Sequence, residues 1–312
     1  MATCRLEGSG STWQTPAVRR PTVPTVLLAL GLAAGCGSAS TTPDGGPGGP
    51  SATPAPTSPT PTPTGAPPRP EADPGPGEYL AGLPATVEVP EVPPAAVVVL
   101  VPGGGWATAD PSALAPLGAH LRSAGLATVT ITYGTSSTGT SWPVPADDVR
   151  CAVAFAAEQV PDVPVVLAGH SAGAHLAAVV GLAPAGEDAS CPYPDRAADG
   201  VVGLAGPYDV SATGGLAGNL FGVPEPEAPA LWAEGNPLLL AGERPEVPFL
   251  LLQGDADRLV GEEFARGFEA VLAEGDHPVR VEVLAGATHS GILRPDVSGD
   301  VVAGWVLETL AG

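Results

Sequence analysis

A serine between two glycines is the residue of this 312-residue chain whose surroundings best suit covalent chemistry. Residues 165–180 read VVLAGHSAGAHLAAVV, so Ser171 follows an apolar, β-branched run and precedes a run with helical spacing. A sharp turn from strand to helix here exposes the hydroxyl and places the Ala172 amide at a helix N-terminus. This context predicts a nucleophile, with a purely structural glycine-rich turn as the alternative.

A serine nucleophile needs a histidine base, which an acid in turn orients. His289 comes shortly after the predicted strand 279–286 and therefore lies at the sheet edge where the strands end. The other four histidines precede that strand, lie within predicted helices or belong to the serine turn: His120, His170, His175 and His277. Position along the chain therefore favours His289 as the base and predicts structural roles for His170 and His175.

The acid that orients the base is expected after the preceding strand, residues 247–254. Two carboxylates follow this strand in the sequence GDADRLV, namely Asp255 and Asp257. Both fall at the same sheet edge as the serine turn, so position alone leaves the choice open. The carboxylate that is not used has an ordinary role as a turn residue that accepts local backbone hydrogen bonds.

Three glycines in the sequence VPGGGWA, residues 101–107, could supply hydrogen-bond donors to a developing oxyanion. The sequence follows a predicted strand, 95–101, and glycine lets the backbone approach a substrate closely. We expect the amides of Gly104 and Gly105, together with that of Ala172, to form the oxyanion hole. A flexible turn is the alternative for the three glycines.

The elements that must position these residues alternate along residues 78–312, which we interpret as one domain. Apolar runs predict strands at 95–101, 126–133, 163–169, 200–206, 247–254 and 279–286. Helical spacing predicts helices at 111–125, 144–160, 171–183, 261–275 and 297–312. This alternation predicts an α/β fold with a mostly parallel sheet and helices on both faces. Residues 207–246, rich in Pro and Gly, interrupt it as a small cap-like insertion.

These segments together resemble the α/β-hydrolase fold, and more narrowly its serine esterases with His-Gly-Gly-Gly-Trp and Gly-His-Ser-Ala-Gly motifs. That branch includes hormone-sensitive-lipase-like esterases, small bacterial carboxylesterases and kynurenine-formamidase-like hydrolases. The matching pieces lie at residues 103–106, 169–173, 206–209, 254–257 and 286–289, within a similar region of about residues 90–312. One departure is Pro102, which replaces the histidine that steadies the oxyanion loop in the family.

The resemblance implies hydrolysis of a carboxylic ester through an acyl-enzyme, without a metal or another cofactor. It selects Asp257 as the acid, because the family places the acid at the fourth position of Gly-x-x-Asp. It also implies that Trp106 and Tyr208 line the substrate pocket, with Phe221 or Trp232 as further candidates, although core packing is the alternative for each aromatic residue.

The N-terminal quarter is expected to contain a targeting signal followed by a tether. Arg19 and Arg20 precede an apolar stretch, residues 23–35, that is too short to span a membrane and is typical of a secretory signal. The segment ends at Cys36 in a sequence that resembles a bacterial lipobox, which predicts lipidation of Cys36; an ordinary secretory signal is the alternative. Residues 1–36 are thus a predicted signal peptide, and residues 37–77 a disordered Pro/Thr/Gly tether.

The charge of the chain limits the classes of partner. The net charge is −21 and all twelve basic residues are arginines, which argues against a nucleic-acid partner.

Cys151 and Cys191 are the two cysteines of the predicted domain, and export favours a disulfide between them over two separate thiols.

The sequence therefore predicts a serine carboxylesterase for small to medium acyl or alcohol groups. We expect it outside the cytoplasm, anchored to the membrane only by its N-terminal lipid, or else secreted. Two alternatives stay open: an amidase or peptidase with the same triad, and a tethered surface protein whose hydrolase fold has weakened activity.

Overall fold

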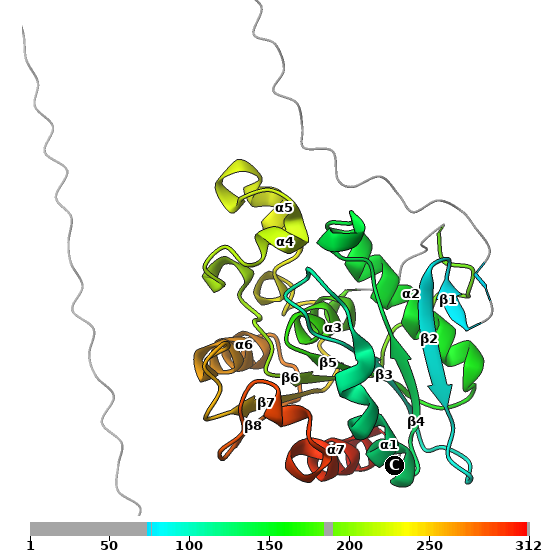
Figure 1. The fold of residues 1–312 in the computed structure, drawn as a ribbon. Coiled ribbons are helices and arrows are strands. Elements are labelled where there is room, and N and C mark those ends of the chain that lie inside the picture. The colour runs from blue at the N-terminus through cyan, green and yellow to red at the C-terminus, as the bar shows by residue number, and fades with distance from the viewer. Residues whose placement is uncertain (1–73, 76, 184–189, 311–312) are drawn as a thin grey trace, which may run out of the picture. The chain divides into compact units, whose positions relative to one another are not determined.

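Eight strands form one sheet in the order β1-β2-β4-β3-β5-β6-β7-β8 in the computed structural model (Figure 1). The structure describes residues 74–75, 77–183 and 190–310, so the predicted signal, Cys36 and nearly all of the tether lie outside the described residues. The strands are β1 (Glu78–Leu80), β2 (Leu83–Glu88), β3 (Val97–Val101), β4 (Ala127–Ile131), β5 (Val165–His170), β6 (Gly200–Leu204), β7 (Phe249–Gly254) and β8 (Val279–Leu284). Strands β3 to β8 pair in parallel, which confirms the predicted sheet.

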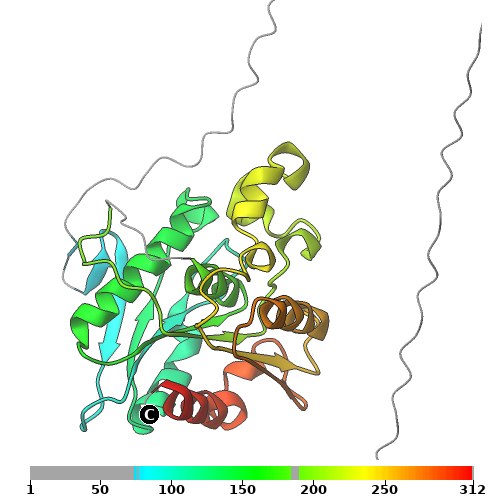
Figure 2. The same cartoon turned by 180° about the vertical axis from the view of Figure 1, so that it is seen from behind.

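Helices cover both faces of this sheet, as the apolar strand runs predict (Figures 1 and 2). One face packs against α2 (Val144–Gln159), α3 (Ala172–Leu182) and α6 (Glu262–Glu274), and the other against α1 (Ala115–Ser123) and α7 (Asp300–Leu310). No helix among the described residues has both the length and the apolar character that crossing a membrane requires.

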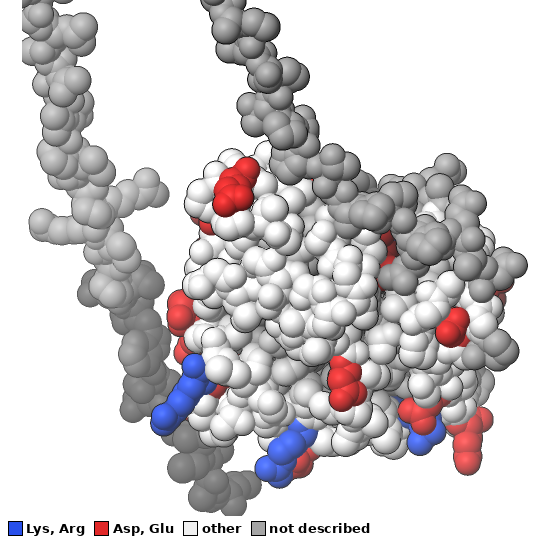
Figure 3. Space-filling view, turned by 45° about the horizontal axis from the view of Figure 1, so that its top comes forward, with Lys and Arg blue, Asp and Glu red and all other residues white. Residues whose placement is uncertain are grey.

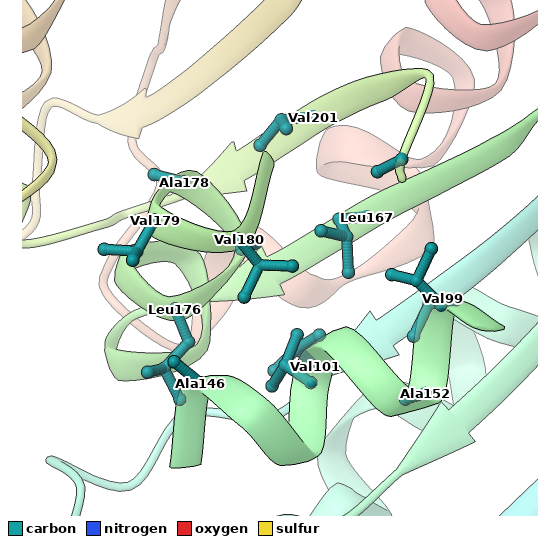
Figure 4. Packing of buried hydrophobic residues seen from close by; sticks show 14 of the residues in the cluster. Val99, Val101, Ala146, Ala152, Leu167, Leu176, Ala178, Val179, Val180 and Val201 are labelled. Atoms are coloured by element: carbon teal, nitrogen blue, oxygen red, sulfur yellow. The ribbon is translucent and has the colours of Figure 1, made fainter. Parts of the chain in front are cut away.

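Successive residues of the central strands point to opposite faces and fill two separate cores. Val99, Leu167 and Val201 pack with α2 and α3 in the first core, which Figure 4 shows from close by. Their neighbours Val98 and Val166 belong to the second core, below α1 and α7. The valine-rich runs are therefore explained by burial on both sides.

An antiparallel edge formed by β1 and β2 was not predicted. Strand β2 pairs antiparallel with both β1 and β4. Its sequence, LPATVE, is only partly buried and includes Pro84, so it lacks the continuous apolar run that marks the central strands.

The insertion between β6 and β7 packs its apolar side chains, Phe221 and Trp232 among them, onto the first core. It contains α4 (Gly218–Phe221), α5 (Pro229–Glu234) and several single turns, shown in yellow tones at the top of Figure 1. We call residues 207–246 the cap segment. Phe221 and Trp232 stack with their ring centroids 4.5 Å apart, and the Trp232 indole donates to the Val223 carbonyl. Both aromatic residues therefore hold the cap segment together and do not line the pocket described below.

A disulfide joins Cys151 of α2 to Cys191, in the segment that leads to β6. Its two cysteines are 40 positions apart, and the segment between them contains Ser171. This pairing is the one that the sequence favoured over two free thiols.

Candidate active site

The turn at Ser171 depends on two glycines. Ser171 has φ 53° and ψ −121°, a conformation that side-chain-bearing residues rarely adopt. A Cβ at Gly169 would lie 2.2 Å from the Gly173 carbonyl oxygen, and a Cβ at Gly173 would lie 2.3 Å from that of Val101. Only glycine allows these close backbone approaches. They bring the turn that carries Ser171 close to β3, the strand that leads into the glycine loop.

The structure brings Ser171, His289 and Asp257 into one chain of hydrogen bonds. The Ser171 Oγ lies 3.0 Å from Nε2 of His289, and His289 Nδ1 lies 2.7 Å from Asp257 Oδ2. With Nδ1 protonated, the imidazole donates to the carboxylate and leaves Nε2 free to accept the serine proton. The three residues thus have the arrangement that a serine nucleophile requires.

Asp257, not Asp255, is the carboxylate that contacts the imidazole. Its side chain is only 1% exposed, and its Oδ1 accepts from the Leu259 and Val260 amides at 2.8 and 3.0 Å. Burial raises the pKa of Asp257, but the Val260 amide, the His289 side chain and the Leu259 amide outweigh it, so the pKa lies below its usual value. Asp255 is exposed and accepts from the Gly286 amide at 2.6 Å, which fits the turn role.

His170 holds the loop that carries the base, which is a structural role as predicted, although the sequence did not show which group it contacts. Its Nε2 lies 2.8 Å from the carbonyl oxygen of His289. Burial lowers the pKa of His170 to about 4, so the ring is neutral and its Nε2–H donates to that carbonyl. His170 therefore fixes the backbone of His289 through this hydrogen bond.

The glycine loop uses its Gly104 carbonyl in local hydrogen bonds but not its expected oxyanion donors. The Gly104 carbonyl accepts from the amides of Ala107 and Thr108, both at 3.1 Å. Among the described residues, no hydrogen bond uses the N–H groups of Gly104, Gly105 or Ala172. These are the three donors that the sequence assigned to an oxyanion hole.

Tyr133 holds the start of the glycine loop. The Tyr133 hydroxyl donates to the Pro102 carbonyl at 3.0 Å, and burial raises the pKa of Tyr133. Sequence reasoning did not identify this residue, although Tyr133 ends the predicted strand 126–133 and so falls at the same sheet edge.

A cavity of about 500 Å³ opens beside Ser171 and the glycine loop. Six apolar residues supply much of its wall: Leu114, Leu216, Leu259, Val260, Phe264 and Leu293. Trp106 also belongs to the wall, but its side chain is almost wholly buried. Within the described ranges, no group of three or more His, Cys, Asp or Glu residues could hold a metal ion.

Tyr208 does not reach this cavity, contrary to the prediction. It is 1% exposed and stacks on Phe268 with ring centroids 4.5 Å apart. A Cβ at Gly203 would lie 1.9 Å from the Tyr208 hydroxyl, so the missing side chain there makes room for the ring in the core.

His175 links the glycine loop to the cap segment. The Trp106 indole donates to Nδ1 of His175 at 3.3 Å, and the opposite nitrogen, Nε2, donates to the Gly235 carbonyl at 2.8 Å. Burial lowers the pKa of His175 to about 4, which keeps the imidazole neutral and able to make both hydrogen bonds.

Acid is expected to destabilise the protein partly through His170 and His175. Their folded pKa values lie near 4, against 6.5 for the free side chain, so the unfolded state binds more protons between these limits. The free energy of unfolding should therefore fall as the pH drops below about 6.5, by on the order of 2 kcal/mol per imidazole at pH 5. Urea unfolding of the protein and of His175→Asn at pH 7.5 and pH 5 measures this; an equal pH dependence in both would contradict it.

The parallel sheet, the strand–serine–helix turn and the Ser-His-Asp hydrogen bonds define the α/β-hydrolase fold class. Residues 87–272 match the model of the BD-FAE family, and the chain belongs to this family. The matched range includes Ser171 and Asp257, and the structure adds His289 from beyond it.

Known relatives are similar over much of the domain. Esterase LipQ of Mycobacterium tuberculosis is 30% identical over 229 residues, which cover 67% of this chain and 53% of that protein. The chain thus spans about half the length of this curated relative.

Solved structures share the fold. A truncated carbohydrate esterase from gut microbiota has a TM-score of 0.63 at 20% identity, covering 72% of this chain and 90% of that one. An acetyl ester-xyloside bifunctional hydrolase from Caldicellulosiruptor lactoaceticus has a TM-score of 0.62 at 18% identity, covering 72% and 88%.

Proposed function

We propose that the protein hydrolyses carboxylic esters through an acyl-enzyme on Ser171. The observation that carries the proposal is the Ser171–His289–Asp257 hydrogen-bond chain. Beside it lie the Gly104, Gly105 and Ala172 amides, which bond to no other group in the described part of the chain. The similarity to proteins described as esterases supports ester bonds as the substrate.

The geometry supports a two-step reaction. In the first step Ser171 Oγ bonds to the ester carbonyl carbon while His289 Nε2 takes its proton. The carbonyl oxygen becomes an oxyanion that the Gly104, Gly105 and Ala172 amides stabilise. The carbon–oxygen bond to the alcohol then breaks, and His289 gives the proton to the departing alkoxide. In the second step water attacks the acyl group, and its proton passes through His289 back to Ser171.

The cavity favours uncharged substituents of small to medium size. Most of its wall is aliphatic or aromatic, and Leu216 and Leu259 at its rim are 51% and 78% exposed. Asp110 also lines it, and the Ser112 amide lowers the pKa of this exposed carboxyl, so it is ionised at neutral pH. No arginine belongs to the part of this wall that the structure describes, and the chain has no lysine.

A pair of matched esters tests the reaction and the charge preference. p-Nitrophenyl butyrate and p-nitrophenyl hemisuccinate have acyl chains of equal length, but the second ends in a carboxylate. We expect a higher kcat/KM for the butyrate, and we expect Asp110→Asn to reduce the ratio about threefold, the effect of one exposed charge. Preference for the hemisuccinate would refute the charge argument, and hydrolysis of neither ester would refute the function. Cleavage of the matching p-nitroanilide would identify an amidase instead.

We also propose that the enzyme works outside the cytoplasm, tethered by a lipid on Cys36. The signal-like segment before Cys36 supports this location, and the Cys151–Cys191 disulfide fits an oxidising compartment. In the native host the protein should fractionate with membranes, and Cys36→Ala should release it to the soluble fraction. An unchanged distribution would contradict the tether.

The described surface in Figure 3 shows no field of a single charge. On this face, the few basic side chains of the described residues lie beside acidic ones, and uncharged surface dominates elsewhere.

A further inference from the structure

The glycine loop receives one hydrogen bond from the cap segment. Asn219 of α4 directs its side-chain Nδ2 at the carbonyl oxygen of Gly105, 3.0 Å away and 114 residues earlier in the chain. Since Gly105 is an expected oxyanion donor, a residue of the cap segment contacts the catalytic loop directly. We propose that Asn219 is a positioning residue that sets the orientation of the oxyanion donors, an inference that rests on the proposed function.

The loop needs hydrogen bonds from other segments to fix its conformation, because its glycines leave the backbone dihedral angles little restricted. Gly104 and Gly105 have φ 136° and 59°, and Trp106 follows at φ 57°. These angles lie in the region that favours glycine, and glycine flanks allow peptide planes to rotate at little steric cost.

Three carbonyls of the loop accept hydrogen bonds, each from a different donor or pair of donors. Tyr133 holds the Pro102 carbonyl, and the amides of Ala107 and Thr108 hold that of Gly104. For the Gly105 carbonyl, Asn219 is the sole hydrogen-bond donor among the described residues. This carbonyl belongs to the Gly105–Trp106 peptide, so loss of the bond frees rotation about ψ of Gly105, directly beside the Gly105 amide.

The part of the cap segment that carries Asn219 is itself bonded to the main domain. The Leu220 carbonyl of α4 accepts from the Trp142 amide at 2.7 Å, just before α2 begins. Leu216 stands over the loop, because a Cβ at Gly105 would lie 3.7 Å from one of its methyl carbons. Asn219 thus reaches the loop from a helix that is anchored to the main domain.

A donor held in place before the reaction stabilises the transition state more than the bound substrate, so its loss lowers kcat. Removing one oxyanion donor outright costs about 10²- to 10³-fold in kcat, and loosening its support should cost less. We expect a fall in kcat of about tenfold to a hundredfold without Asn219, with little change in KM.

Two substitutions separate the hydrogen bond from packing. Asn219→Asp keeps the size of the side chain but has no donor when ionised, and Asn219→Ala removes the side chain. Asn236→Ala is the matched control, because Asn236 is another cap asparagine, one that bonds to Asp209 and to the Leu238 amide, not to the loop. For each variant kcat and KM for p-nitrophenyl butyrate, the melting temperature and the Ki of a butyl boronic acid are measured. The tetrahedral boronate on Ser171 places an oxygen in the oxyanion hole, so its affinity reports on the donors.

The expected result is a lower kcat and weaker boronate binding in both Asn219 variants, at a melting temperature no lower than that of Asn236→Ala. Unchanged kcat in both Asn219 variants would overturn the proposal, as would an equal loss in Asn236→Ala or a change in KM alone. If the unaltered protein shows no hydrolysis that depends on Ser171, the proposed function itself fails. The two failures are therefore distinguishable.

Discussion

Replacing Ser171 by alanine should lower kcat/KM for p-nitrophenyl butyrate by about 10⁴-fold or more. The serine Oγ is the atom that forms the covalent bond, and it lies 3.0 Å from the base that accepts its proton. Loss of a nucleophile leaves only the contribution of the oxyanion hole and substrate binding. Steady-state kinetics measures the loss, and reaction with a fluorophosphonate probe should disappear with it.

A second serine provides the control for this experiment. Ser123 lies on α1, and its hydroxyl donates to the His120 carbonyl, away from the cavity. Ser123→Ala should keep full activity and probe labelling. Activity or labelling that persists in Ser171→Ala would show that another residue is the nucleophile. His289→Ala combined with Ser171→Ala should add little to the loss, because the two residues act as a unit.

Asp257→Asn should reduce kcat by about 10³- to 10⁴-fold. The Asp257 carboxylate accepts the Nδ1 proton of His289 at 2.7 Å and so leaves Nε2 facing the serine. An amide can present an N–H to the same ring nitrogen, which favours the wrong tautomer and leaves Nε2 protonated against Ser171. The fold should be retained, since the amide has the size of the carboxylate.

Asp255→Asn is the matched control, because the two aspartates are two positions apart. Asp255 bonds to the Gly286 amide and does not contact His289. This variant should keep kcat within a fewfold of the unaltered protein and lose only some stability. A larger loss for Asp255→Asn than for Asp257→Asn would reverse the assignment that the hydrogen bonds support.

The sequence predicted the central sheet well, because burial on both faces leaves long apolar runs such as 95–101. It also located the candidate triad, because parallel strands deliver Ser171, Asp257 and His289 to one edge. The choice of Asp257 over Asp255 needed the family resemblance, since both follow the same strand.

The supporting contacts were beyond sequence reasoning. Asn219 and Gly105 meet across 114 residues, in a loop and a short helix whose conformations follow from packing and not from periodicity. Tyr208 illustrates the same limit: an aromatic residue near a strand end can line a cavity or fill the core. Here the absence of side chains at Gly203 and Gly206 makes a hole for its ring.

The imidazole of His175 has a consequence for engineering. Trp106 of the glycine loop and Gly235 of the cap segment both depend on this one ring, which the helix after Ser171 carries. A chimera that takes its cap from another hydrolase must therefore reproduce a carbonyl at the position of Gly235. Otherwise a buried imidazole N–H is left unpaired, and the exchange costs stability before substrate choice can change.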